Sequence, residues 1–258
     1  MHDILIRGGL LYDGSGAPGV PGDVAIKDGH IVAIASKLTE ASQKIIDAQG
    51  LAVAPGFIDI KTHSDFTLPI NPKAESKVRQ GVTTEIIGHC GFSVAPALAG
   101  KVELLRDYLS PSAPWTPFRE LSFPDYLDTF PKTSVNAGML VGHNTLRLMV
   151  MGLEDRAPSA AELEQMTALL EDGLQAGALG LSTGLFTPPG SFAQADEIMA
   201  LCAVVATTRV AASIVKVRAN AERRALRNGS SLIESLFKVT QAKQPDLWSV
   251  GARPTGAS

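Results

Sequence analysis

From Pro55 onward, short apolar stretches that suit β-strands alternate with amphipathic stretches that suit α-helices. The predicted strands lie in the segments GFIDI, VTTEIIG, VNAGMLVG and GALGLS, and the predicted helices lie at 72–81, 101–109, 160–175 and 194–206. Strands that are each followed by a helix run in parallel, because the helix carries the chain back along the sheet. The alternation therefore predicts an α/β fold around a parallel sheet, either open or closed into a barrel.

The chain divides by pattern into three segments. Residues 1–55 contain short predicted strands separated by turn signals, of which Asp28-Gly29 is the strongest hairpin signal, so we predict a small N-terminal β-domain. Residues 56–205 carry the strand and helix units. Residues 206–258 hold nine Lys/Arg and three Asp/Glu with little apolar periodicity, and we predict an atypical basic tail there.

Two local signals lie inside the second segment. Ser159 and Glu162 form a capping box for the helix at 160–175, and Gly177 is placed to end it. The stretch 110–124 holds four prolines and several aromatic residues, which predicts a long surface excursion. We expect the helix to be well defined and the excursion to lack regular structure.

Charge and hydropathy exclude several classes of protein. The net charge of −3 argues against nucleic acid as a partner. The chain has no apolar run of about 18 residues and no apolar signal core near its start, so we expect no membrane span, no export signal and a cytoplasmic location. Cys90 and Cys202 are too few and too far apart for a disulfide framework.

Side chains suited to acid–base chemistry or metal binding follow three of the predicted strands. The end of the first strand carries Asp59, Lys61, His63 and Asp65. The pair His89-Cys90 follows the second strand, and His143 follows the third. In a parallel barrel such strand ends gather at one face, where active sites form. Zinc accepts neutral imidazole nitrogen and thiolate sulfur. The pattern therefore predicts a metal site at this end of the sheet.

Each of these residues also has a structural interpretation. A histidine after a strand is commonly a hydrogen-bonded structural residue, and a cysteine beside glycine is commonly a small buried side chain. Asp59 can simply fix the end of its strand. The sequence leaves these alternatives open at each single position.

In combination, three segments resemble a known family. They are PGFIDIKTHSDFTLPINPKAESKVRQGVTTEIIGHCGFSVAP, VGHNTLRLMVMG and GALGLSTGLFTPPGSFA. They are similar to the N-acyl-D-amino-acid deacylases, or D-aminoacylases, of the amidohydrolase superfamily, and the resemblance runs from about Asp3 to Val205. It implies a zinc-dependent (β/α)₈ TIM-type barrel with a small β-domain. It also implies an enzyme that hydrolyses a linear amide, releasing a carboxylate and a free D-amino acid from an N-acyl-D-amino acid substrate.

The resemblance also implies roles for individual residues. His63 and Cys90 match zinc ligands of the family, and Asp59 and His143 match residues expected to be catalytic. Substrate-binding roles fall on Arg147, Ser182, Thr183 and Thr187.

The chain departs from the family pattern at several of these places. Lys61 stands at the first histidine of the family's His-x-His strand, where a protonated amine has three donors and no lone pair for a metal. Thr187 stands where a pocket tyrosine is common, and no histidine follows His143. We therefore expect an incomplete zinc site and an incomplete barrel, of which the segment 56–205 supplies about half. The alternative function is a non-catalytic relative that binds an acyl-amino acid or a partner chain without hydrolysis.

Overall fold

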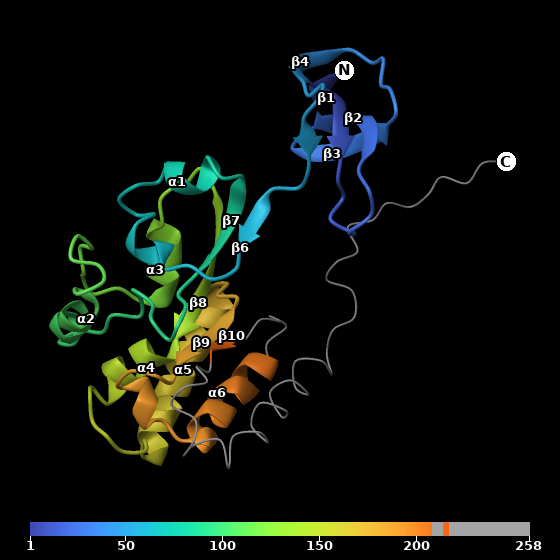
Figure 1. Ribbon diagram of the computed structural model, residues 1–258. Coiled ribbons are helices and arrows are strands. Elements are labelled where there is room, and N and C mark those ends of the chain that lie inside the picture. The colour runs from blue at the N-terminus through green and yellow to red at the C-terminus, as the bar shows by residue number, and fades with distance from the viewer. Residues whose placement is uncertain (208–213, 217–258) are drawn as a thin grey trace. The chain divides into compact units, whose positions relative to one another are not determined.

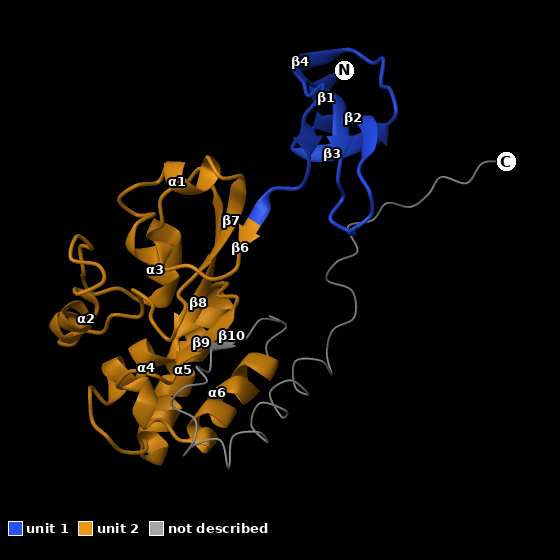
Figure 2. Cartoon of the chain, viewed as in Figure 1, with its two compact units in different colours: residues 1–57 blue, residues 58–258 orange. Residues whose placement is uncertain are grey.

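The computed structural model describes residues 1–207 and the backbone of residues 214–216. The chain forms two compact units, residues 1–57 and residues 58–258 (Figure 2). Within the described residues, each helix is either too short or too polar to cross a membrane.

The first unit is a five-stranded β-sheet. Its strands are β1 (His2–Leu11), β2 (Val20–Lys27), β3 (His30–Ala35), β4 (Ser42–Asp47) and β5 (Ala52–Val53). They are arranged in the order β3-β2-β1-β4, and β5 also pairs with β1. Asp28 and Gly29 join β2 to β3, and both have positive φ angles, 49° and 75°. A two-residue hairpin turn needs positive φ angles to match the right-handed twist of the strands that it joins. The hairpin predicted at Asp28-Gly29 is confirmed.

The second unit is built on a sheet with the strand order β10-β9-β8-β7-β6 (Figure 1). The strands are β6 (Phe57–Asp59), β7 (Val82–Ile87), β8 (Asn136–Gly142), β9 (Gly180–Gly184) and β10 (Ile214–Lys216). The pairs β7–β8, β8–β9 and β9–β10 are parallel. The predicted α/β class, the N-terminal β-sheet and the parallel sheet are thus confirmed, and the sheet corresponds to half of a barrel.

Helices connect the strands of this sheet. They are α1 (Glu75–Val78), α2 (Val102–Leu109), α3 (Phe123–Thr129), α4 (His143–Val150), α5 (Ala160–Ala176) and α6 (Ala195–Thr207), with 3₁₀ turns η1 (Ser64–Phe66) and η2 (Gly190–Phe192). The capping box of Ser159 and Glu162 is present, and Gly177 ends α5 in the left-handed conformation. Both signals are confirmed.

Two expectations about helices need correction. The helix predicted at 72–81 is only the single turn α1, which begins after Ala74 in a left-handed conformation. The excursion predicted at 110–124 is irregular up to residue 121 but then enters α3, where Ser122 accepts a hydrogen bond from the Asp125 N–H. Pro124, which suggested a break, lies in the first turn of α3, where the missing N–H costs nothing.

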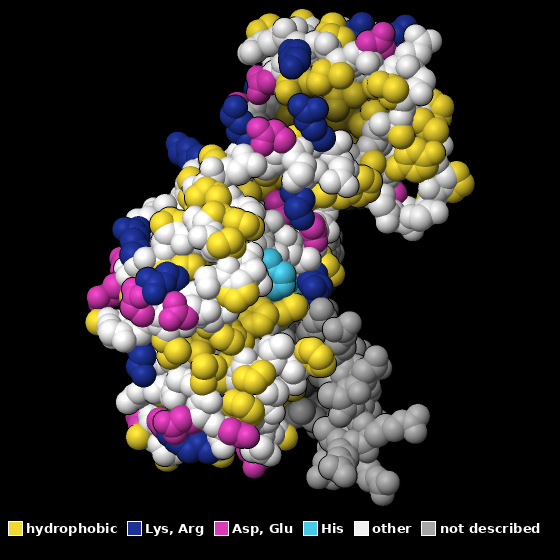
Figure 3. Space-filling model, turned by 60° about the vertical axis from the view of Figure 1, so that its left-hand side comes forward, with side chains coloured by type: hydrophobic (Ala, Val, Ile, Leu, Met, Phe, Trp, Pro, Cys, Tyr) yellow, Lys and Arg dark blue, Asp and Glu magenta, His cyan; other side chains and the backbone are white. Residues whose placement is uncertain are grey.

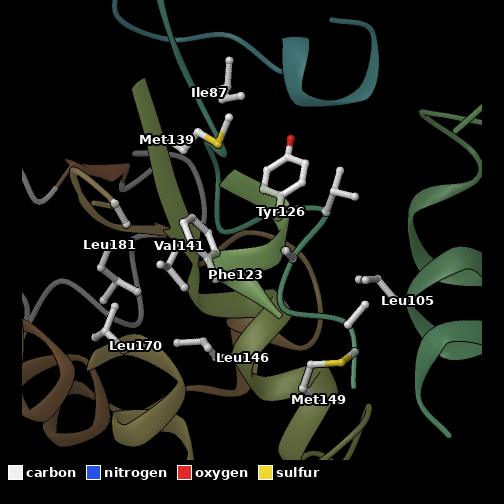
Figure 4. Packing of buried hydrophobic residues seen from close by; sticks show 14 of the residues in the cluster. Ile87, Leu105, Phe123, Tyr126, Met139, Val141, Leu146, Met149, Leu170 and Leu181 are labelled. Carbon is white, nitrogen blue, oxygen red and sulfur yellow. The ribbon is translucent and has the colours of Figure 1, made fainter. Parts of the chain in front are cut away.

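The core of the second unit lies between the sheet and helices α3, α4 and α5. Buried residues from β8, α3 and α4, among them Val141, Phe123 and Leu146, meet there (Figure 4). Leu170 of α5 and Leu181 of β9 extend the same cluster. This packing fixes the C-terminal ends of β7, β8 and β9, which carry most of the predicted site residues.

Hydrophobic side chains also reach the surface in both units (Figure 3). In the first unit, Ile31 and Ile34 of β3 are more than half exposed. In the second unit, Trp115 is 53% exposed. Trp115 also belongs to the wall of a cavity beside His63.

Candidate active site

His63 lies in the turn that follows β6, directly before η1. The Thr62 N–H donates to the Ile86 carbonyl at 3.2 Å, which ties this turn to β7. The imidazole of His63 stacks on Phe66 with ring centroids 6.0 Å apart and lies 6.1 Å from the ring of Phe92. Aromatic neighbours thus hold a half-buried His63 at the end of the sheet.

A cavity of about 460 Å³ opens beside His63. It is lined by His63, Phe66, Thr67, Phe92, Tyr108, Leu109, Ser112, Trp115 and Thr187. A volume of this size suits a small organic ligand. Of the residues predicted from sequence, His63 and Thr187 line this cavity, and Ser182 and Thr183 do not.

Cys90 lies on the loop that follows β7 and has a positive φ of 58°. The end of β9 holds this loop in place. The Gly91 N–H donates to Ser182 Oγ at 3.0 Å, and the same hydroxyl donates to the Gly88 carbonyl at 2.5 Å. Gly184 lets the two backbones meet, because a Cβ there would lie 1.9 Å from the Cys90 carbonyl oxygen. Buried Ser182 therefore positions the segment that carries Cys90.

His89 precedes Cys90 and is almost fully buried. Burial lowers the pKa of His89 to about 4, and the nearby charges of His63 and Lys61 add to this effect. A hydrogen bond to the Ile60 carbonyl opposes it only in part. The imidazole of His89 is therefore neutral at pH 7. Lys61 itself is exposed.

Asp59 takes part in a polar network that the sequence analysis did not anticipate. Lys77 Nζ lies 2.5 Å from the Asp59 carboxylate and 3.3 Å from the carboxylate of buried Glu85. The hydroxyl of Ser64 donates a short hydrogen bond to the same Glu85 oxygen. The hydrogen bond from Lys77 holds the pKa of Asp59 below its usual range, although partial burial acts in the opposite direction. Asp59 is thus an anion that pairs with Lys77.

Asp65 is a second acid at the end of the first predicted strand, where the sequence analysis noted it without assigning it a role. It lies in η1, two residues after His63, and is 1% exposed. Burial raises the pKa of Asp65 to about 7, and the nearby backbone N–H groups of Asp65 and Gly88 offset only part of that rise. Its burial could not be predicted from the sequence, because a turn after a strand commonly contains a solvated aspartate.

His143 and Arg147 both lie on α4 and are both fully buried. The structure joins them through Glu197 of α6. His143 Nε2 lies 2.8 Å from one oxygen of Glu197, and Arg147 donates to the other at 2.5 Å. Arg147 also donates to the Arg156 carbonyl at 2.9 Å. Neither His143 nor Arg147 lines the cavity beside His63.

Glu197 is the third member of this cluster, and nothing in the sequence singled it out. Burial would raise the pKa of Glu197, but hydrogen bonds from His143 and Arg147 outweigh burial and hold the pKa below its ordinary value. An acidic residue in the first turn of a helix is usually a solvated residue that complements the helix dipole. Only the packing of α6 against the sheet places this one in the interior.

Among the residues that the structure describes, the candidate metal donors do not form a complete zinc site. In the part of the chain that the structure describes, no three His, Cys, Asp or Glu residues come together as a metal-binding group. All five histidines and both cysteines of the sequence fall within residues 1–207, so residues 208–258 offer no further nitrogen or sulfur donor of these types. A catalytic zinc takes three protein ligands, and the sequence analysis predicts only two in this chain, His63 and Cys90.

Comparison with known proteins relates the chain to amidohydrolases. The model of the Amidohydrolase family matches residues 44–245. An N-acyl-D-aspartate deacylase and a D-aminoacylase, both from Alcaligenes xylosoxydans xylosoxydans, are 45% and 40% identical over 202 residues, or 78% of this chain. These segments make up 40% and 41% of the two relatives, so the chain spans less than half of their length.

Two solved structures extend the comparison. A D-aminoacylase structure with a binuclear metal centre is 33% identical with a TM-score of 0.80, and the match covers 93% of this chain and 50% of that one. The N-acyl-D-glutamate deacylase of Bordetella bronchiseptica, in complex with zinc and a phosphonate inhibitor, is 39% identical with a TM-score of 0.72. That match covers 81% of this chain and 44% of the other. The resemblance inferred from the sequence motifs is confirmed.

Proposed function

This chain belongs to the amidohydrolase family, and on that premise we propose that it acts on N-acyl-D-amino acids as an amide hydrolase, giving a carboxylate and a free D-amino acid. The identity to N-acyl-D-amino-acid deacylases supports the substrate class. The observation that carries the proposal is the cavity of about 460 Å³ with His63 in its wall. It lies beside the turn after β6, the place where enzymes with parallel sheets bind their substrates.

The residues of this chain supply only some of the ligands that a catalytic zinc needs. A zinc-bound relative of the family is known, and His63 and Cys90 are the proposed ligands for a metal in this chain. Two donors do not complete a catalytic zinc site, and Lys61 adds a cation where a third donor is expected. We therefore derive no hydrolytic step through zinc from the described residues.

The remaining proposed roles concern binding and positioning. We propose that Thr187 contacts the substrate, which its position in the cavity wall supports. Ser182 holds the loop of Cys90, so we propose that it acts through that loop. The predicted catalytic roles of Asp59 and His143 stay predictions, since the contacts of these residues are with Lys77 and Glu197.

A second candidate function is binding of an N-acyl-amino acid without hydrolysis. The observation that favours it is that no group of three metal-binding side chains forms among the described residues. The exposed ammonium group of Lys61 would complement the carboxylate of such a ligand.

One experiment separates the two functions. Purified protein is loaded with zinc, its metal content is measured by mass spectrometry, and release of D-methionine from N-acetyl-D-methionine is followed. Turnover that depends on added zinc supports the hydrolase. Binding of N-acetyl-D-methionine by calorimetry with no turnover at any zinc concentration supports the binding protein and defeats the hydrolase.

A further inference from the structure

A second cavity, of about 130 Å³, opens beside Asp65 and is called the Asp65 cavity below. Asp65 of η1 lines it, whereas the next residue, Phe66, lines the cavity beside His63. In the same way, Thr116 lines the Asp65 cavity and Trp115 lines the other one. Among the described residues, the two linings have no member in common. The Asp65 cavity is therefore separate from the proposed substrate site.

Two buried polar side chains without partners lie at the inner end of the Asp65 cavity. Asp65 is 1% exposed, and Tyr126 of α3 is 6% exposed. Within the described part of the chain, neither carboxyl oxygen of Asp65 and not the hydroxyl of Tyr126 has a hydrogen-bond partner. Buried polar side-chain atoms nearly always have such a partner, because they lose their hydration on folding. Three unpaired oxygens at one cavity therefore indicate a ligand that donates hydrogen bonds to them.

Tyr126 presents its hydroxyl from the core of the second unit. Its ring packs edge to face against Phe123 and Phe130, with centroids 6.2 and 5.5 Å apart. In Figure 4 the hydroxyl points away from Phe123. Burial raises the pKa of Tyr126 well above its ordinary value, and the charge of Asp65 adds to this rise. The hydroxyl is therefore protonated at pH 7, and it can both donate and accept.

The remaining wall of the Asp65 cavity is apolar inside and polar at the mouth. Val94, Leu121, Phe130 and three prolines contribute apolar surface. Arg119 and Thr129 also line the cavity and are both exposed, so they lie at its mouth. The guanidinium of Arg119 donates to the Thr129 hydroxyl at 3.4 Å. Among the described lining residues, the acidic group thus lies inside and the basic group lies outside.

From these observations we propose that the Asp65 cavity binds a small primary ammonium group with a short apolar body. An ammonium group has three N–H donors and no lone pair, which suits a carboxylate and a phenol oxygen. It also supplies the positive charge that a buried carboxylate needs. A hard metal ion such as Ca²⁺ would need about six or more oxygen ligands, more than the side chains of Asp65 and Tyr126 offer.

The ammonium group can belong to an alkylamine or to a small free amino acid, and Arg119 distinguishes these sources. Its guanidinium at the mouth would complement the carboxylate of an amino acid. The probes are n-propylammonium and D-alanine, and propionate, which has the chain but no ammonium group, is the negative comparison. Ligand-observed NMR on the full chain, at constant ionic strength, gives Kd for each probe.

We expect n-propylammonium to bind with a Kd of about 1 mM, as its few heavy atoms allow, and propionate not to compete. Asp65→Asn keeps the shape of the side chain but removes its charge, so Kd should rise by at least about tenfold. Tyr126→Phe keeps the ring in the core and should raise Kd by about fivefold.

The matched control is Asp128→Asn. Asp128 is an exposed acid on the same helix as Tyr126 and lies outside the lining, so this variant should leave Kd unchanged. Circular dichroism of each variant checks that the fold is kept. Arg119→Gln should weaken D-alanine but not n-propylammonium if the natural ligand is an amino acid.

Several results would overturn the inference. They are an equal Kd for the parent and a folded Asp65→Asn variant, competition by propionate, or no binding of either ammonium probe up to about 100 mM. In the last case the cavity holds water alone. Tighter binding of D-alanine that is lost in Arg119→Gln assigns the site to an amino acid, and tighter binding of n-propylammonium assigns it to an alkylamine. None of these measurements requires hydrolysis of an N-acyl-D-amino acid, so the inference and the proposed function can fail separately.

Discussion

The buried carboxylate of Glu197 offers the sharpest test of the structure, since it holds two helices together. Its side chain is 2% exposed, and both partners, His143 and Arg147, are 0% exposed. The substitution Glu197→Gln keeps the shape of the side chain but removes its charge, so the guanidinium of Arg147 stays buried without an anion. Breaking a buried ion pair from one side costs about 3 kcal/mol of folding free energy.

This cost converts into a measurable shift. With a urea dependence of about 2 kcal/mol per molar, the unfolding midpoint should fall by about 1.5 M. The emission of Trp115, in a Trp248→Phe background, reports unfolding of the second unit. Glu103→Gln is the matched control, because Glu103 pairs with Arg106 at the surface with a side chain that is 71% exposed, and its midpoint should stay within error of the parent.

The pH dependence supplies a second readout with a defined sign. Because the pKa of Glu197 is lowered in the folded state, its contribution to stability is present above the ordinary glutamate pKa of about 4.3 and is lost as the pH falls through the lowered value. Glu197→Gln should therefore show a shallower loss of stability on acidification than the parent. A midpoint change below about 0.5 M together with an unchanged acid profile would refute the buried cluster.

Three further predictions concern other parts of the chain. Lys61→His should raise the affinity for zinc by at least about tenfold, measured in competition with a chelating dye. Lys61→Gln removes the charge without adding a donor, so it should not raise the affinity. Equal zinc affinities of the two variants would argue against a metal site at this position. In Gly184→Ala the methyl group of the alanine would overlap the Cys90 carbonyl. The variant should therefore lower the unfolding free energy by about 2 kcal/mol and change the rate at which a thiol reagent modifies Cys90. An unchanged rate would contradict the close approach of Gly184 to Cys90. The N–H groups of Gly8 and Leu38 donate to Asp23 at 2.7 and 2.8 Å. Asp23→Ala should therefore lower the stability of the first unit by about 2 kcal/mol and speed hydrogen exchange at these two N–H groups. Slow exchange in the variant would show that Asp23 does not stabilise the first unit in this way.

Much of the fold could be predicted from the sequence because its signals are local. The strands of the parallel sheet and the helix α5 follow from apolar periodicity and from the capping box at Ser159. The single turn α1 was overestimated because its amphipathic stretch is interrupted by Ala74 in a left-handed conformation, which composition does not reveal. Helix α3 was missed because its start, Ser122 followed by Phe123 and Pro124, lies inside a stretch rich in proline.

The candidate site was less predictable because its parts come together from distant segments. His63 and Thr187 lie 124 positions apart in the printed sequence, and both line one cavity. The aromatic residues that complete the cavity, such as Tyr108 and Trp115, come from α2 and from the irregular stretch after it. Helical periodicity identifies Tyr108 only as a partly apolar surface residue. The partners Lys77 and Glu197 were missed for the same reason, since each occupies a helix position where a solvated charge is ordinary.

The two proposed zinc ligands are positioned by contacts between neighbouring strands. His63 is fixed by the pairing of its turn with β7, and Cys90 is fixed by the contact of its loop with Ser182 of β9. Each donor therefore depends on the register between neighbouring strands, and a third donor would have to come from another strand end. The cavity wall shares His63 with the proposed metal site, but most of it is formed by η1, Phe92, α2 and the segments around Trp115 and Thr187. The Lys61→His variant therefore tests the proposed metal site without changing a residue that lines the cavity.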